Sequence, residues 1–119
     1  MDVAVRDAAR GRVILCPTGE IDMSSADALE AALREAVRRP DARAVLVDLS
    51  RVDFLDSAGV RALLRGADAG AVHAVPVRVT DPQPAVARIL RITGVGPLLG
   101  WADGEAYRAD GPARWRRFG

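Results

Sequence analysis

The feature of this sequence that most constrains its fold is a short, almost continuous apolar run at residues 44–49, Ala-Val-Leu-Val-Asp-Leu. Such a run is typical of a central strand that helices cover on both sides, whereas a strand with one face in water alternates apolar and polar residues. Segments with helical spacing of apolar residues stand on either side of the run. We therefore expect residues 44–49 to form the middle of a sheet.

Strand-like and helix-like segments alternate along the rest of the chain. Val3 and Val5, followed by residues 13–16, predict an N-terminal β-hairpin, and residues 75–80 predict a later strand. Pro17 has no N–H, so we expect its strand to lie at an edge or to end there. The alternation predicts an α/β fold, a single domain with a mixed sheet of about four to five strands flanked by about four helices.

Three amphipathic helices are predicted from apolar residues at helical spacing. The first is preceded by Ser24 and Asp27, which resemble a capping box, and we expect it to end at Pro40. Its outer face carries two charged pairs at i,i+4 spacing, Glu30–Arg34 and Glu35–Arg39. The core sides of the helices are expected at Ala26, Leu29, Leu33 and Val37; at Val60, Leu63, Leu64 and Ala67; and within residues 85–92, closed by Gly94.

The pattern weakens toward the C-terminus. We expect a short strand within residues 98–101 and a last helical turn at residues 105–109. The domain is expected to span residues 1–110, with residues 111–119 as a loose tail. Residues 114–118 mix arginine with aromatic side chains, which suits a nucleic-acid or membrane contact, but a tail of this kind more often covers an apolar patch or has no fixed structure.

The composition excludes several classes of function. A chain of 119 residues can form one domain with its own core. The net charge of +1 gives no broad field for nucleic acid or an anionic membrane, and no apolar run approaches the ~20 residues that span a bilayer. Cys16 and His73 alone are too few ligands for a zinc site. We expect Cys16 to be a small core hydrophobe and His73 to be an exposed loop residue. These features predict a cytoplasmic protein without a metal or cofactor, as a monomer or weak dimer.

The strongest candidate site is the stretch Asp56-Ser57-Ala58-Gly59, where the second predicted helix begins. The first backbone N–H groups of a helix lack partners within the helix, and a serine hydroxyl at this position should be reachable from solvent. The alternative is that Asp56 or Ser57 only caps the helix, which is the commoner role for such residues.

Catalysis has little support in the sequence. A nucleophilic serine needs a nearby general base, and the chain contains one histidine, His73, and no lysine. It also lacks a glycine-rich phosphate loop. Asp22, Asp53 and Asp56 can be interpreted as a carboxylate cluster for acid–base or magnesium chemistry, but turn and cap roles are commoner for aspartate. We therefore expect a protein that is not an enzyme, so any phosphate on Ser57 must be delivered by another protein.

Two stretches of the chain, taken together, resemble the sulfate-transporter and anti-sigma-factor-antagonist family, known as STAS domains. The first is Gly-Glu-Ile-Asp at residues 19–22, followed by the first predicted helix. The second runs from residues 47–50 through residues 54–59 to Leu63-Leu64. A weaker match covers residues 86–94, so the resemblance extends from about residue 3 to about residue 105.

The resemblance implies a small mixed sheet flanked by helices. In the bacterial antagonists of this family, the serine directly after the aspartate of the second motif accepts phosphate, which corresponds here to Ser57. By the same matching, Asp22, Asp56, Ser57, Ala58 and Gly59 form the partner-binding surface. Ala58 stands where many relatives carry a second hydroxyl residue, so the resemblance implies a single acceptor.

The function that the resemblance implies is that of an anti-sigma factor antagonist. The unphosphorylated form binds an anti-sigma factor serine/threonine kinase and releases a sigma factor. Phosphorylation at Ser57 by that kinase ends the interaction, and a phosphatase restores it. The alternative is a STAS scaffold, or an accessory subunit of a transporter or signalling assembly, in which Ser57 is only a cap.

Overall fold

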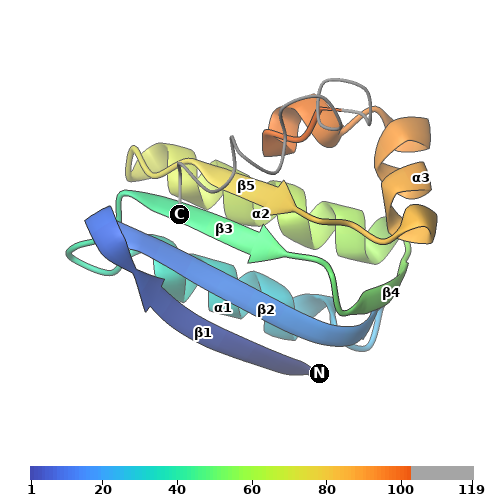
Figure 1. The fold of residues 1–119 in the computed structure, drawn as a ribbon, viewed down its shortest axis with the longest axis horizontal. Coiled ribbons are helices and arrows are strands. Elements are labelled where there is room, and N and C mark those ends of the chain that lie inside the picture. Colours follow the sequence, from blue (N-terminus) through green and yellow to red (C-terminus); the bar gives the residue numbers. More distant parts are fainter. Residues whose placement is uncertain (103–119) are drawn as a thin grey trace.

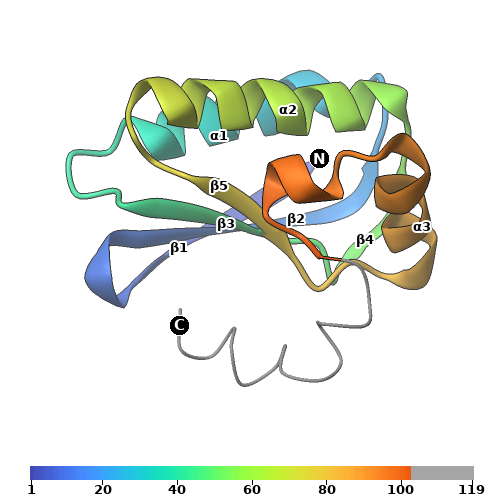
Figure 2. The same ribbon diagram turned by 90° about the horizontal axis from the view of Figure 1, so that it is seen from above.

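The computed structural model describes residues 1–102 and shows a five-stranded mixed sheet with two long helices on one face (Figures 1 and 2). Short 3-10 helices at Ala9–Gly11 and Gly96–Leu99 complete this part of the chain. The expected turn at residues 105–109, the tail and the boundary at residue 110 lie outside the described residues. The main elements are β1 (Asp2–Ala8), β2 (Arg12–Ile21), α1 (Ala26–Val37), β3 (Ala44–Asp48), β4 (Val52–Leu55), α2 (Ser57–Val72), β5 (Val77–Thr80) and α3 (Pro84–Thr93).

The strand order places β3 inside the sheet, as the apolar run predicts. β1 and β2 form the expected antiparallel hairpin, β2 pairs in parallel with β3, and β3 pairs in parallel with β5. The short strand β4 pairs in parallel with the last residues of β2. The α/β class and the mixed sheet predicted from the sequence are thus confirmed.

The core lies between the sheet and the helices α1 and α2, which run side by side over the same face (Figure 2). Leu29 and Leu33 of α1, Leu63 of α2, and Val45 and Val47 of β3 are fully buried there. The residue between the two valines, Leu46, is buried but does not belong to this core cluster. Among residues 1–102, no helix covers the face of the sheet opposite α1 and α2. The apolar run predicts helices on both faces, so this part of the prediction is wrong.

Pro17 lies inside β2, between its two parallel neighbours. β3 pairs with residues 12–15 of β2 and β4 pairs with residues 19–21, so neither strand is registered with Pro17. On the other side Pro17 is opposite Val3 of β1. The missing N–H of Pro17 is therefore accommodated at the gap between the β3 and β4 ladders. The expectation of an edge or an end holds only on the side of β2 that faces β3 and β4.

Three local predictions are wrong. The capping box of Ser24 and Asp27 does not form, because α1 begins two residues after Ser24 and neither side chain caps it. Arg39 pairs with Asp7 of β1, not with Glu35, while the expected pair of Glu30 and Arg34 is present at 3.0 Å. The strand expected within residues 98–101 is a 3-10 helix, Gly96–Leu99, that begins with Pro97 in its first turn.

Candidate functional site

The start of α2 is built around the side chain of Asp56. Asp56 has an extended backbone, φ −112° and ψ −172°, and its Oδ1 accepts a hydrogen bond from the backbone N–H of Gly59 at 3.0 Å. Asp56 is thus the N-cap, and Ser57 is the first residue of the helix. Ser57 is exposed and its hydroxyl is not the cap, so the side chain can be reached from solvent.

The loop that contains Asp22 lies beside this helix start. Ile21 of β2 pairs with Leu55 of β4, and the backbone N–H of Asp56 donates to the carbonyl oxygen of Ile21 at 3.2 Å. Asp22 and Ser57 therefore follow directly from two strand ends that are held together. The structure thus brings Asp22, Asp56, Ser57, Ala58 and Gly59 to one edge of the sheet.

Asp22 is held in its ionised form by its own loop. The backbone N–H and the hydroxyl of Ser24 both donate to Asp22 Oδ1, at 2.9 and 2.7 Å. The hydrogen bond from the Ser24 hydroxyl is the main cause that lowers the pKa of Asp22 below its ordinary value. A negative charge is therefore fixed in the loop that follows β2.

Ser25 is a structural member of the site that the sequence analysis missed. It is buried, its Oγ donates to the carbonyl oxygen of Glu20 at 2.7 Å, and it accepts from the backbone N–H of Asp22 at 2.9 Å. These two bonds span the whole turn from β2 into α1 and fix its shape. The only signal for Ser25 in the sequence is its place as the second of two adjacent serines before the helix, and the capping-box pattern favours the first, Ser24.

Gly59 is required by packing. It is buried, and a Cβ at this position would lie 2.5 Å from Leu55 Cδ1 and 2.7 Å from Ile21 Cγ2. A side chain there would push α2 away from the ends of β2 and β4. Ala58, between Ser57 and Gly59, is half-buried and packs against the core. The glycine therefore keeps Ser57 close to the Asp22 loop.

A β-bulge in β4 changes which side chains of this strand face the solvent. Gly19 pairs with Val52 and Glu20 pairs with Phe54, so Asp53 is the extra residue. The shift lets Leu55 enter the core beside Ile21 and leaves Phe54 on the surface beside Glu20, with 47% of its area exposed. No periodicity in the sequence signalled this exposed aromatic side chain.

The other candidate residues are not part of this site. His73 is exposed at the far end of α2, one full helix of 16 residues from Ser57, so it is not a base for that hydroxyl. Cys16 is half-buried rather than a core residue; burial first, and then the charge of Asp48, raise the pKa of its thiol. Within residues 1–102, no group of three metal-binding side chains is assembled, so Asp22, Asp53 and Asp56 do not form a cation site.

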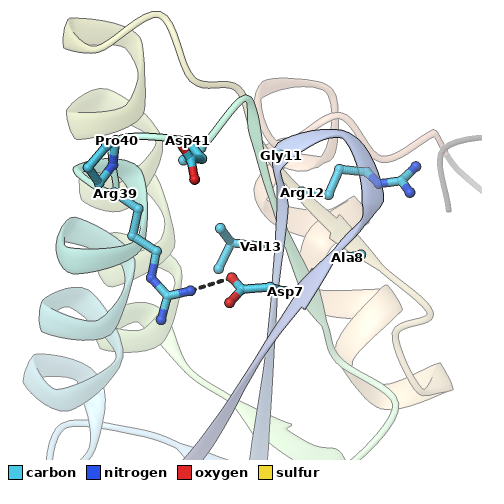
Figure 3. Close-up of a pocket in the computed structure, with 9 residues that line it drawn as sticks. Asp7, Ala8, Gly11, Arg12, Val13, Arg39, Pro40 and Asp41 are labelled. Atoms are coloured by element: carbon cyan, nitrogen blue, oxygen red, sulfur yellow. Dashed lines mark hydrogen bonds and ion pairs between the residues drawn. The ribbon is translucent and has the colours of Figure 1, made fainter.

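A separate hollow of about 360 Å³ lies at the opposite end of the sheet. Figure 3 shows Arg39, which follows α1, paired with Asp7 of β1 among the residues that line this hollow. It is lined by the last residues of β1, the first residues of β2 and residues 39–42, which follow α1, whereas Ser57 lies just beyond the last residues of β4. No candidate residue from the sequence analysis lines it.

The fold and the site together define a small α/β domain that presents one exposed serine at the start of a helix, beside an acidic loop. A family model described as "Mlab, STAS domain" matches residues 5–100. The chain belongs to the STAS domain family. None of the helices among residues 1–102 is long and apolar enough to cross a membrane.

Similar proteins include several antagonists of anti-sigma factors. The anti-sigma F factor antagonist of Paenibacillus polymyxa is 26% identical over 96 residues, 81% of this chain and 82% of that protein. An anti-sigma factor antagonist from Mycobacterium paratuberculosis is 29% identical, with a TM-score of 0.72 over 88% of this chain and 87% of that chain. A sulfate transporter family protein from Wolinella succinogenes shares the fold at 18% identity, with a TM-score of 0.67 over 79% of this chain and 75% of that chain.

Proposed function

We propose that this protein is an anti-sigma factor antagonist whose docking is switched by phosphorylation of Ser57. The unphosphorylated form binds an anti-sigma factor serine/threonine kinase in the cytoplasm and so releases a sigma factor. The kinase then modifies Ser57 and the complex separates, until a phosphatase removes the phosphate. The role is regulatory, and any catalysis belongs to the partners.

The observation that carries the proposal is the exposed Ser57 hydroxyl on a rigid frame. Asp56 caps the helix and Gly59 packs it closely, so Ser57 is presented at a fixed place without itself supporting the fold. A kinase can reach such a hydroxyl. Because the serine is exposed, adding a phosphate requires no opening of the core.

A phosphate on Ser57 is expected to disfavour docking through charge. It adds about −1.5 to −2 charges at pH 7 on the residue next to Asp56, at a strand end that is hydrogen-bonded to the residue before Asp22. The N-terminus of α2 offsets part of this, by roughly 0.3–1 kcal/mol, but Asp56 already occupies the N–H of Gly59. Removing a dianion from water at an interface costs more than this offset, so the modified form is expected to dissociate.

The similar proteins support the same assignment. The relatives from Paenibacillus and Mycobacterium are anti-sigma factor antagonists. SpoIIAA, another anti-sigma factor antagonist with this fold, has been solved in an unphosphorylated and a phosphorylated form.

The test is the affinity of three variants for each anti-sigma factor kinase encoded in the same genome. We expect Ser57→Ala to bind as tightly as the unmodified chain and Ser57→Asp to bind at least tenfold more weakly. Ala71→Asp adds the same charge on the last turn of α2, and should bind normally. If Ser57→Asp and Ala71→Asp bind equally well, the switch is absent and a scaffold without phospho-control is the better description.

A further inference from the structure

Two large apolar side chains are exposed where β2 and β4 end, close in sequence to Asp22 and Ser57. Met23, in the Asp22 loop, has 81% of its area exposed, and Phe54, on β4, has 47%. Both belong to the edge where β2 and β4 end, since Glu20 pairs with Phe54 and Ile21 pairs with Leu55. Exposed apolar side chains gathered next to a polar site are typical of binding surfaces.

The backbone near both residues is fixed by neighbouring contacts. The backbone around Met23 is fixed by the hydrogen bonds of Ser24 to Asp22 and of Ser25 to Glu20. Phe54 is turned outward by the β-bulge at Asp53, while its neighbour Leu55 is anchored in the core. Little conformational entropy of the backbone therefore remains to be lost when a partner covers them.

The two chain segments that carry these side chains are acidic although the whole chain is not. We define the docking edge as residues 20–27 and 51–61, which contain five carboxylates and two arginines, a net charge of −3 in a chain with a net charge of +1. The two arginines, Arg51 and Arg61, stand at the outer ends of the second segment. A partner that fits this edge must therefore be basic around an apolar centre.

We infer that Met23 and Phe54 are the apolar anchors by which the unphosphorylated chain binds a basic, apolar-centred surface of the anti-sigma factor. The inference rests on the proposed function and adds two residues, Met23 and Phe54, to the partner-binding residues that the resemblance implies. Methionine and aromatic residues are enriched at the centres of interfaces, where a few side chains carry most of the binding energy. The carboxylates around them select the partner and speed its approach.

The test compares matched variants of the full chain in calorimetric binding to the purified kinase that phosphorylates Ser57. Met23→Ser is paired with Val72→Ser, whose side chain is 83% exposed at the end of α2. Phe54→Thr is paired with Val5→Thr, a strand residue of β1 with the same 47% exposure. We expect each anchor variant to bind at least tenfold more weakly and each control to stay within twofold. Circular dichroism and urea midpoints verify that all four are folded.

The outcomes separate this inference from the switch. If Ser57→Asp abolishes binding while Met23→Ser and Phe54→Thr keep full affinity, the two apolar side chains are not anchors, and control by phosphorylation of Ser57 is still supported. If the anchor variants weaken binding and Ser57→Asp does not, the docking edge is supported and the switch fails. An affinity that does not fall when the salt concentration rises contradicts the acidic edge, and a wild-type chain that binds none of the kinases overturns both proposals.

Discussion

The backbone N–H of Asp56 donates to the carbonyl oxygen of Ile21 at 3.2 Å, which joins the residue before Ser57 to the residue before Asp22. This single bond continues the pairing of β4 with β2 beyond the last strand residue. As a result, the helix that carries the phosphorylation candidate and the loop that carries the fixed negative charge form one unit.

Removing the cap of α2 should destabilise the protein. Asp56→Ala leaves the N–H of Gly59 without its side-chain acceptor, which costs about 1 kcal/mol, within a range of roughly 0.5–2. The free energy of unfolding in urea measures this loss. Asp68→Ala, an exposed position in the same helix, should change stability by less than ~0.5 kcal/mol. Equal effects of the two substitutions would show that Asp56 is not a cap.

A methyl group at position 59 should disturb the site without touching Ser57. Gly59→Ala places a Cβ within 2.8 Å of Leu55 and Ile21 atoms, and overpacking of this kind costs about 1–3 kcal/mol. Helix propensity returns at most ~1 kcal/mol, so we expect a net loss of stability in urea unfolding. Ser57→Ala, at an exposed position two residues earlier, should stay within ~0.5 kcal/mol of the parent chain. A Gly59→Ala variant as stable as the parent would contradict the packing described here.

The hydroxyl of Ser24 should control the charge of Asp22. Because that hydroxyl lowers the pKa of Asp22, Ser24→Ala should raise the pKa toward its ordinary value of about 4. An NMR titration of the Asp22 carboxyl carbon measures the change, and Ser57→Ala serves as the control. Since the pKa is lower in the folded state, the bond stabilises the fold above about pH 4 and this contribution is lost as the pH falls further. An Asp22 pKa that Ser24→Ala leaves unchanged would refute this assignment.

The class of fold and the start of the helix that carries Ser57 could be predicted from the sequence because they depend on local patterns. The apolar run at residues 44–49 identified the inner strand, and Asp56 followed by a helical pattern identified the start of α2. The positive φ of 73° at Gly94, where α3 ends, was likewise marked by the glycine itself. Each of these signals lies within one segment.

The features that were missed depend on pairs of residues that are distant in the sequence. Arg39 prefers Asp7 to Glu35 because the β1–β2 hairpin passes the end of α1, 32 residues away along the chain. The exposure of Phe54 depends on a register shift between β2 and β4, which alternation within β4 does not reveal. Burial of Ser25 likewise follows from the path of the chain between β2 and α1.

The most direct measurement combines phosphorylation and binding in one preparation. The purified chain is incubated with ATP and each candidate anti-sigma factor kinase, its peptides are analysed by mass spectrometry, and the affinities of the modified and unmodified forms are compared. We expect one phosphate, on Ser57, with at least tenfold weaker binding and an unchanged urea midpoint. A chain that no kinase modifies at Ser57, or a phosphorylated form that binds as tightly as the unmodified one, would contradict it.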